Sequence, residues 1–167
     1  MTYTNKAYIA FDADNDIRYY RLMQAWKNNE HHSFGFNDAH DLNNLRHYSS
    51  EETIKNKLQE RLRNTKVFIL LVWENTRYLY KFVRWEIEQA IKKGIPIIVV
   101  NLNWKRSIDS NNCPAIARDN LSMHVSFNQK IIVHAINNWP DLYEKYKSEW
   151  KDWGYYYKES LYKEIWL

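Results

Sequence analysis

The sequence has few of the residues that interrupt or cross-link a chain. Its 167 residues include 3 Gly, 3 Pro and 1 Cys. With so few glycines, neither a glycine-rich dinucleotide-binding fingerprint nor a P-loop can be written. The single Cys113 excludes an internal disulfide and fits a reducing compartment. The low Gly and Pro content also argues against linker or low-complexity sequence.

Long apolar runs are missing as well. The longest, VFILLVW at 67–73, is far shorter than the roughly 20 residues that span a bilayer. The first residues, MTYTNKAYIAFDAD, lack the basic, apolar and small-residue succession of a secretion signal. We therefore predict a cytoplasmic protein with no membrane partner. The net charge of +4 is compatible with a phosphorylated ligand or nucleic acid and identifies neither.

Apolar runs and helical stripes alternate along most of the chain. Strands are predicted at 7–11, 33–38, 66–72, 95–102 and 121–127, and helices at 16–29, 49–64, 82–94 and from about 129. The runs at 66–72 and 95–102 are apolar throughout, as central parallel strands covered on both faces are. The alternation predicts an α/β fold: a doubly wound, mostly parallel sheet with helices on both faces.

Short signals refine three of these helices. Ser49 followed by Glu52 predicts a capping box at the start of 49–64. Gly94 is expected at the C′ position, just after the helix 82–94. Core contacts of the helix 16–29 are expected from Tyr20, Leu22 and Met23, among others.

The C-terminal segment is rich in aromatic residues. Their spacing alternates between four and three, which predicts one helical face for Trp139, Tyr143, Tyr146, Trp150, Trp153 and Tyr157. A second short helix is expected after Gly154. We therefore predict two units, an α/β domain at 1–138 and an aromatic helical extension at 139–167 that packs on the same domain. Self-association is a weaker second expectation.

Glu86 occupies an unusual position in the helix 82–94. At about 100° per residue, Val83, Ile87 and Ala90 form an apolar stripe, and Glu86 falls at its margin. Glu88 points away toward solvent. Burying a carboxylate is costly unless it is paired, so Glu86 either pairs with a nearby group or serves a function.

Other chemistries fit the sequence poorly. DADND at 12–16 resembles a calcium loop, but Ile17 and Met23 stand where that loop needs Gly and Glu. The histidines lack ligand spacing, so no metal site is predicted. An enzyme with this composition would rely on carboxylates and aromatic rings. These suit cleavage of an N-glycosidic bond, where a carboxylate stabilises the positively charged transition state.

Residues 6 to 102 resemble the TIR-like proteins of bacterial antiphage systems, in particular the Thoeris TIR subunits. The resemblance rests on the opening strand AYIAF with the following Asp, on FNDA, on NT-RYLYKFVRWEIEQAIKKG and on IPIIVVNLN. The sequence departs from the family pattern at Phe82, where relatives often carry Trp. The resemblance implies a flavodoxin-like, TIR-like fold.

The resemblance also implies an activity and a site. In the family the helix Glu is the catalytic residue of NAD⁺ cleavage, and it corresponds here to Glu86. The substrate-binding residues would be Phe11, Asp12, Asp14, Asp38, His40, Trp73 and Asn75. NAD⁺ would be the substrate, with no resident cofactor. The products would be nicotinamide and an ADP-ribose derivative, by analogy a cyclic isomer that diffuses to a separate effector.

Two other functions stay open at this point. The first is a TIR-like module that binds protein partners without turnover, and the second, less favoured, is a basic, aromatic nucleic-acid-binding protein. The residues also leave open whether water or an internal adenosine group attacks the ribosyl carbon. Nicotinamide release separates the first alternative from an enzyme, and salt-dependent binding of nucleic acid would support the second.

Overall fold

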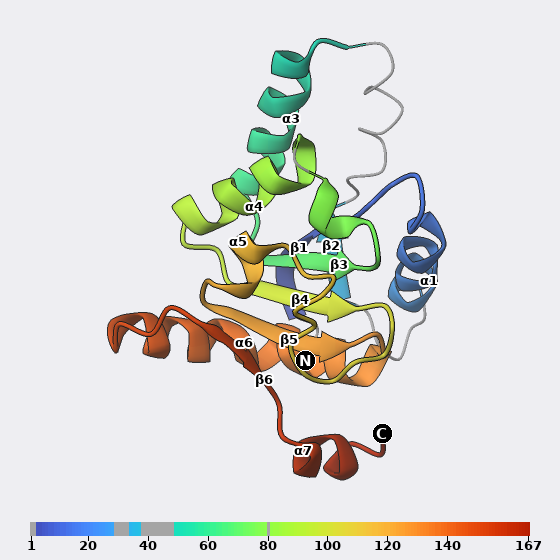
Figure 1. Ribbon diagram of the computed structural model, residues 1–167, viewed down its shortest axis with the longest axis vertical. Helices are drawn as coiled ribbons and strands as arrows, with labels where there is room; N and C mark the ends of the chain where they lie inside the picture. Colours follow the sequence, from blue (N-terminus) through green and yellow to red (C-terminus); the bar gives the residue numbers. More distant parts are fainter. Residues whose placement is uncertain (1–2, 29–33, 38–48, 80) are drawn as a thin grey trace.

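The structure, a computed structural model that describes residues 3–28, 34–37, 49–79 and 81–167, contains a six-stranded parallel sheet (Figure 1). The strand order is β2-β1-β3-β4-β5-β6. The strands are β1 (Tyr3–Ala10), β2 (Phe34–Asn37), β3 (Val67–Val72), β4 (Ile97–Asn101), β5 (Ser122–Ser126) and β6 (Gly154–Tyr156). The first five strands follow the flavodoxin-like order. The predicted fold class is confirmed.

Helices cover both faces of this sheet (Figure 1). One face carries α1 (Ile17–Lys27), α6 (Gln129–Ser148) and α7 (Glu159–Glu164), and the other carries α3 (Glu51–Arg63), α4 (Phe82–Lys92) and α5 (Ala115–Arg118). A 3-10 turn, η1 (Thr76–Tyr78), precedes α4. Within the described part of the chain, no helix is both long and apolar enough to cross a membrane.

The central strands supply two cores. All six residues of β3 are buried. Ile69 and Leu71 belong to the cluster on the α1–α6 face, while Phe68, Leu70 and Val72 belong to the cluster on the α3–α4 face. This alternation follows from the two-residue period of a strand. It explains why the sequence of β3 is continuously apolar.

Two of the three helix signals need correction. The side chain that caps α3 belongs to Ser50, whose Oγ accepts the Thr53 N–H at 3.3 Å, so the predicted cap at Ser49 is wrong by one residue. Leu22 is 49% exposed and is not a core contact, because Tyr20 and Met23 take the buried face of α1. Gly94 is confirmed at C′, with a φ of +65° that an L side chain rarely adopts.

The aromatic stripe predicted over 139–157 is only half correct. Helix α6 ends at Ser148, and Trp150 adopts a left-handed φ of 59° while the Lys151 N–H donates to the Tyr146 carbonyl at 3.0 Å. Trp150, Trp153 and Tyr157 therefore lie beyond the helix. The following strand β6 was not predicted, and it pairs with β5.

The expected second helix of the C-terminal segment is present as α7. The division at residue 138 stays a prediction. In the structure α6 runs across that position, and β6 extends the same sheet as the preceding strands.

Candidate functional site

Glu86 lies on the side of α4 that faces the sheet. Its side chain is buried, at 2% exposure, together with those of Val83, Ile87 and Ala90. The helix presents these residues because positions three and four apart share a face. Glu86 is therefore a carboxylate inside an otherwise apolar layer.

Tyr8 is a hydrogen-bond donor to this carboxylate. Its hydroxyl, from the middle of β1, donates to Glu86 Oε1 at 2.5 Å. The Tyr8 ring is fully buried and stacks on Phe68, with centroids 5.5 Å apart and planes 9° from parallel. Packing of the ring thus fixes the hydroxyl, and the hydroxyl orients the carboxylate. Sequence reasoning missed this pair because its members are 78 positions apart.

Such a carboxylate can act on a positive charge. Buried charges interact through a lower effective dielectric than charges in water, so their fields are stronger at short range. A hydrogen bond from a fixed donor also limits the reorganisation needed when a charge develops nearby. The arrangement suits electrostatic stabilisation of a cation.

Asp12 organises the loop that follows β1. It is 5% exposed, and its Oδ1 accepts the Asp14 N–H at 3.1 Å while its Oδ2 accepts the Asn15 side-chain amide at 2.7 Å. Its carbonyl also accepts the Asp16 N–H at 2.8 Å. Asp12 therefore holds the turn into α1, and Asp14 is exposed on that turn.

Asp16 is a further candidate that sequence reasoning did not single out. It is 2% exposed at the start of α1. Burial, together with the nearby Asp12 charge, raises the pKa of its carboxyl to about 6 against the opposing effect of Arg18. A buried carboxyl whose pKa is raised in this way is a candidate for a functional group. The signal in the sequence is the alternation of acids in DADND.

Phe11 and Trp73 lie on the opposite face of the sheet from Glu86. Phe11 is 5% exposed and stacks on Tyr20 of α1, with ring centroids 4.8 Å apart. Trp73 is half-buried against the same cluster of side chains. Both rings follow the carboxyl ends of their strands, as expected, but in this structure they pack into the α1–α6 core.

The remaining predicted residues have different positions. Asn75 is exposed at the start of η1, where its carbonyl accepts the Tyr78 N–H at 3.0 Å. Asp38 and His40 lie outside the described residues. The structure thus gathers Phe11, Asp12, Asp14, Trp73 and Asn75 at the carboxyl ends of β1 and β3, while Glu86 contacts β1 two residues before its end. The substrate-binding set stays a prediction.

A cavity of about 570 Å³ lies beside this region. It is bounded by η1, the first turn of α4 and the segment 110–120. None of the predicted site residues that the structure describes lines it. Its walls combine residues of 76–84 with residues of 110–120, so no local pattern in the sequence predicts it.

The described residues offer no ready metal centre. Among them, no group of three or more His, Cys, Asp or Glu side chains is placed to hold a metal ion. Cys113 is buried, and burial raises the pKa of its thiol to about 12, so it is not a thiolate nucleophile near neutral pH.

The fold and the site identify the class of protein. A parallel sheet in flavodoxin order, polar loops at the carboxyl ends of its strands and a buried Glu on the helix after β3 define a flavodoxin-like α/β protein with a buried carboxylate beside its sheet. The family model for the TIR-like domain of the Thoeris protein ThsB matches residues 8–107, more than half of the chain. The chain belongs to this family and is a Thoeris-type antiphage TIR-like protein.

Proposed function

We propose that this protein is an enzyme that cleaves NAD⁺ to nicotinamide and an ADP-ribose derivative during antiphage defence. The observation that carries the proposal is Glu86. It is a buried carboxylate on a helix of a Thoeris TIR-like domain, and it accepts a hydrogen bond from the buried Tyr8 hydroxyl of β1. A purely apolar layer would pack with less cost, since a buried charge has to be compensated.

The chemistry requires little besides a fixed negative charge. The bond between the ribosyl carbon and the nicotinamide nitrogen breaks, and its electron pair leaves with neutral nicotinamide. Positive charge develops on the ribose, where Glu86 would stabilise it. The nucleophile, water or a group of the adenosine half, then attacks the ribosyl carbon and loses a proton. Attack by water gives ADP-ribose. Attack by the adenosine group gives a cyclic isomer, which we propose diffuses to a separate effector.

Access to Glu86 requires rearrangement. The side chain is 2% exposed, so a substrate has to displace groups that cover it. We propose that NAD⁺ enters from the edge formed by the loops after β1 and β3, with Asp12, Asp14 and Asn75 among its contacts. NAD⁺ is a substrate here, and the proposal includes no resident cofactor. A cytoplasmic location remains part of the proposal, because the free thiol of Cys113 fits a reducing compartment.

Replacement of Glu86 by Gln tests the proposal. Glu86→Gln keeps the shape and removes the charge, so NAD⁺ consumption should fall about 10²–10³-fold. Glu88→Gln is the matched control, because Glu88 is exposed on the same helix and pairs with Arg84 at 3.0 Å. Nicotinamide release by purified protein and by infected cells is the measurement, with thermal melting to verify the fold. Undiminished release by folded Glu86→Gln would contradict the proposal.

One observation also favours a second candidate, a TIR-like interaction module without turnover. Glu86 is buried and hydrogen-bonded in the way that a structural carboxylate is. Suppose the wild-type chain releases no nicotinamide even in infected cells, while Glu86→Gln lowers the free energy of unfolding. Glu86 is then a structural carboxylate, and the protein is an interaction module without turnover. Mass spectrometry of the nucleotide product separates hydrolysis from cyclisation if release occurs.

A further inference from the structure

The cavity of about 570 Å³ is suited to a small molecule. Its volume falls in the range of about 300–1,000 Å³ that small-molecule pockets occupy. Apolar groups form one part of the wall, including Leu79 after η1 and Pro114 and Ile116 around α5. Tyr78 adds a ring that is 53% exposed. The cavity therefore offers an apolar and aromatic surface of the kind that binds a flat ring.

The cavity is separate from the Glu86 carboxylate. Arg84 lines the cavity, and it precedes Glu86 by two residues, which is about 200° around the helix. Arg84 contacts exposed Glu88 at 3.0 Å, whereas Glu86 contacts Tyr8 at 2.5 Å on the sheet side. The two side chains thus leave α4 in nearly opposite directions.

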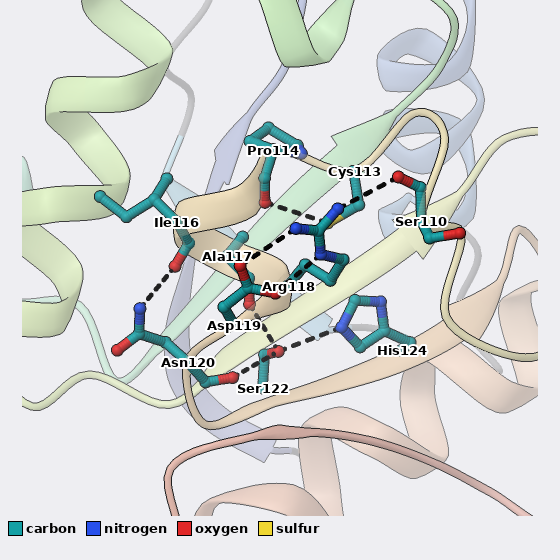
Figure 2. A network of polar contacts seen from close by, with 10 residues as sticks. All are labelled: Ser110, Cys113, Pro114, Ile116, Ala117, Arg118, Asp119, Asn120, Ser122 and His124. Atoms are coloured by element: carbon teal, nitrogen blue, oxygen red, sulfur yellow. Dashed lines mark hydrogen bonds and ion pairs between the residues drawn. The ribbon is translucent and has the colours of Figure 1, made fainter.

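Arginines are the main charged groups of the rim. Three of them line the cavity, Arg77, Arg84 and Arg118, together with one acid, Asp119. Arg84 is paired with exposed Glu88, which is not part of the lining. Figure 2 shows the Arg118 guanidinium beside Asp119, and two ion-pair contacts of 2.7 and 3.0 Å offset its charge. Arg77 instead donates to the Asn111 carbonyl at 2.7 Å and to the Tyr78 hydroxyl. Since both acceptors are neutral, they leave the charge of Arg77 available to an anion.

The segment 110–120 holds the Arg77 and Arg118 side chains in place. Arg118 Nη1 donates to the Ser110 carbonyl at 3.2 Å (Figure 2). The next carbonyl along the chain, that of Asn111, accepts from Arg77. The segment is itself tied down by buried Asp109, which accepts the Asn112 amide at 2.7 Å and the Asn103 amide at 2.8 Å. Side chains that are already held in place lose less conformational entropy when a ligand binds.

We propose that this cavity is a second ligand site that binds a phosphorylated nucleoside. The phosphate would contact Arg77 and Arg84, which come from η1 and α4. The base or ribose would lie against Tyr78 and the apolar wall of Leu79, Pro114 and Ile116. A ligand bound here lies on the outer side of α4, so it does not occupy the position beside Glu86.

Calorimetric titration of the full chain tests the site with four probes: ATP, AMP, adenosine and inorganic phosphate. We expect ATP and AMP to bind at least about tenfold more tightly than adenosine or phosphate, because neither part alone uses both the arginines and the rings. Arg77→Gln should weaken AMP binding about tenfold or more, as loss of a charge-assisted contact does. Arg63→Gln, an exposed arginine of α3, is the matched control and should change nothing.

A second variant tests the cavity without changing charge. Ala115 is exposed at the rim, so Ala115→Trp should block the cavity while the core stays intact, as thermal melting would verify. Glu86→Gln should leave AMP affinity unchanged. The proposal is overturned if no nucleotide binds, if phosphate binds as tightly as AMP, or if Arg77→Gln and Ala115→Trp bind AMP normally. Loss of AMP binding in Glu86→Gln would also overturn it, by assigning the nucleotide to the position beside Glu86.

Discussion

The two faces of the sheet bury different kinds of side chain. The α3–α4 face is mostly aliphatic, yet it contains the Glu86 carboxylate and the Tyr8 hydroxyl. The α1–α6 face concentrates aromatic rings, including Trp139, Tyr143 and Tyr162. Its buried acids, Asp12 and Asp16, lie in the turn that leads into α1. The same strand serves both faces, since Tyr8 points to one and Ile9 to the other.

Under the proposed function, this contrast places the chemistry on one face and much of the stabilising burial on the other. The family match covers 8–107, which includes Glu86 and Tyr8, whereas α6 and the segments after it lie outside the match. Large rings bury about 150–250 Å² each, so the aromatic face adds much apolar burial. A stable aromatic layer on one face can offset the cost of a carboxylate buried on the other.

The largest expected effect is on the aromatic face. Trp139 is fully buried, and its ring contacts those of Tyr143, Tyr146 and Tyr155. Trp139→Ala should lower the free energy of unfolding by about 3–5 kcal/mol, because it leaves a large cavity. Urea denaturation measures the loss.

Trp139→Phe is the graded control for this change. The indole N–H of Trp139 is buried and has no hydrogen-bond partner among the described residues. Phe keeps much of the packing and removes that group, so Trp139→Phe should cost clearly less than Trp139→Ala. A cost below about 1 kcal/mol for Trp139→Ala would show that the aromatic layer contributes little, and the contrast between the faces would lose its meaning.

The second prediction concerns pH and His124, which is fully buried on β5. Burial lowers the pKa of its imidazole to about 4, against a weaker opposing effect of Asp109. The unfolded chain, with a pKa near 6.5, therefore binds a proton more readily than the folded chain. Stability from this group is complete above pH 6.5 and is lost as pH falls toward 4, by up to roughly 3 kcal/mol.

His124→Gln isolates this contribution. The variant does not titrate, so its unfolding free energy should fall less than that of the wild type between pH 7 and pH 4. Ser122 Oγ lies 3.1 Å from His124 Nε2, and Gln can replace that contact. Parallel curves for the two proteins would show that His124 is not the buried neutral group described above.

The third prediction concerns the polar pair on the α3–α4 face. Tyr8→Phe keeps the ring stacked on Phe68 and removes the hydroxyl that donates to Glu86. Loss of a partner from a buried carboxylate should lower the unfolding free energy by about 1–3 kcal/mol. If Glu86 is catalytic, NAD⁺ cleavage should fall as well. Tyr156→Phe, at an exposed ring of β6, is the control for stability, and an equal cost in both variants would count against the pair.

The sequence predicts the frame of this structure better than its contacts. Continuous apolar runs identify β3 and β4 because both faces of each strand are covered. The end of α6 was missed because Trp150, rather than Gly, takes the left-handed position after the helix. Strand β6 was missed for a related reason: its three residues become a strand only by pairing with β5.

The candidate site divides in the same way. The margin position of Glu86 follows from helical spacing, and its burial agrees with that reading. Its contact with Tyr8 depends on how α4 lies over β1, which no local pattern specifies. The cavity beside η1 depends likewise on two stretches, 76–84 and 110–120, that only the fold brings together.

The smallest expected effect concerns Asp16, at the start of α1. Burial raises the pKa of its carboxyl to about 6, so the folded chain binds a proton more readily than the unfolded chain, where the pKa is 3.8. The penalty for its charge is complete above pH 6 and shrinks as pH falls toward 3.8. The full shift from 3.8 to about 6 would correspond to roughly 3 kcal/mol. Solvent screening reduces this penalty, so Asp16→Asn should stabilise the protein by roughly 1 kcal/mol at pH 8 and by less at pH 4.5. Asn serves equally well at a helix start.

Thermal melts at both pH values measure the difference, with exposed Asp152→Asn as the control. An equal gain at both pH values would mean that ionised Asp16 does not destabilise the folded protein. Asp12 and Asp16 would then be ordinary residues of the turn into α1 rather than a candidate functional pair.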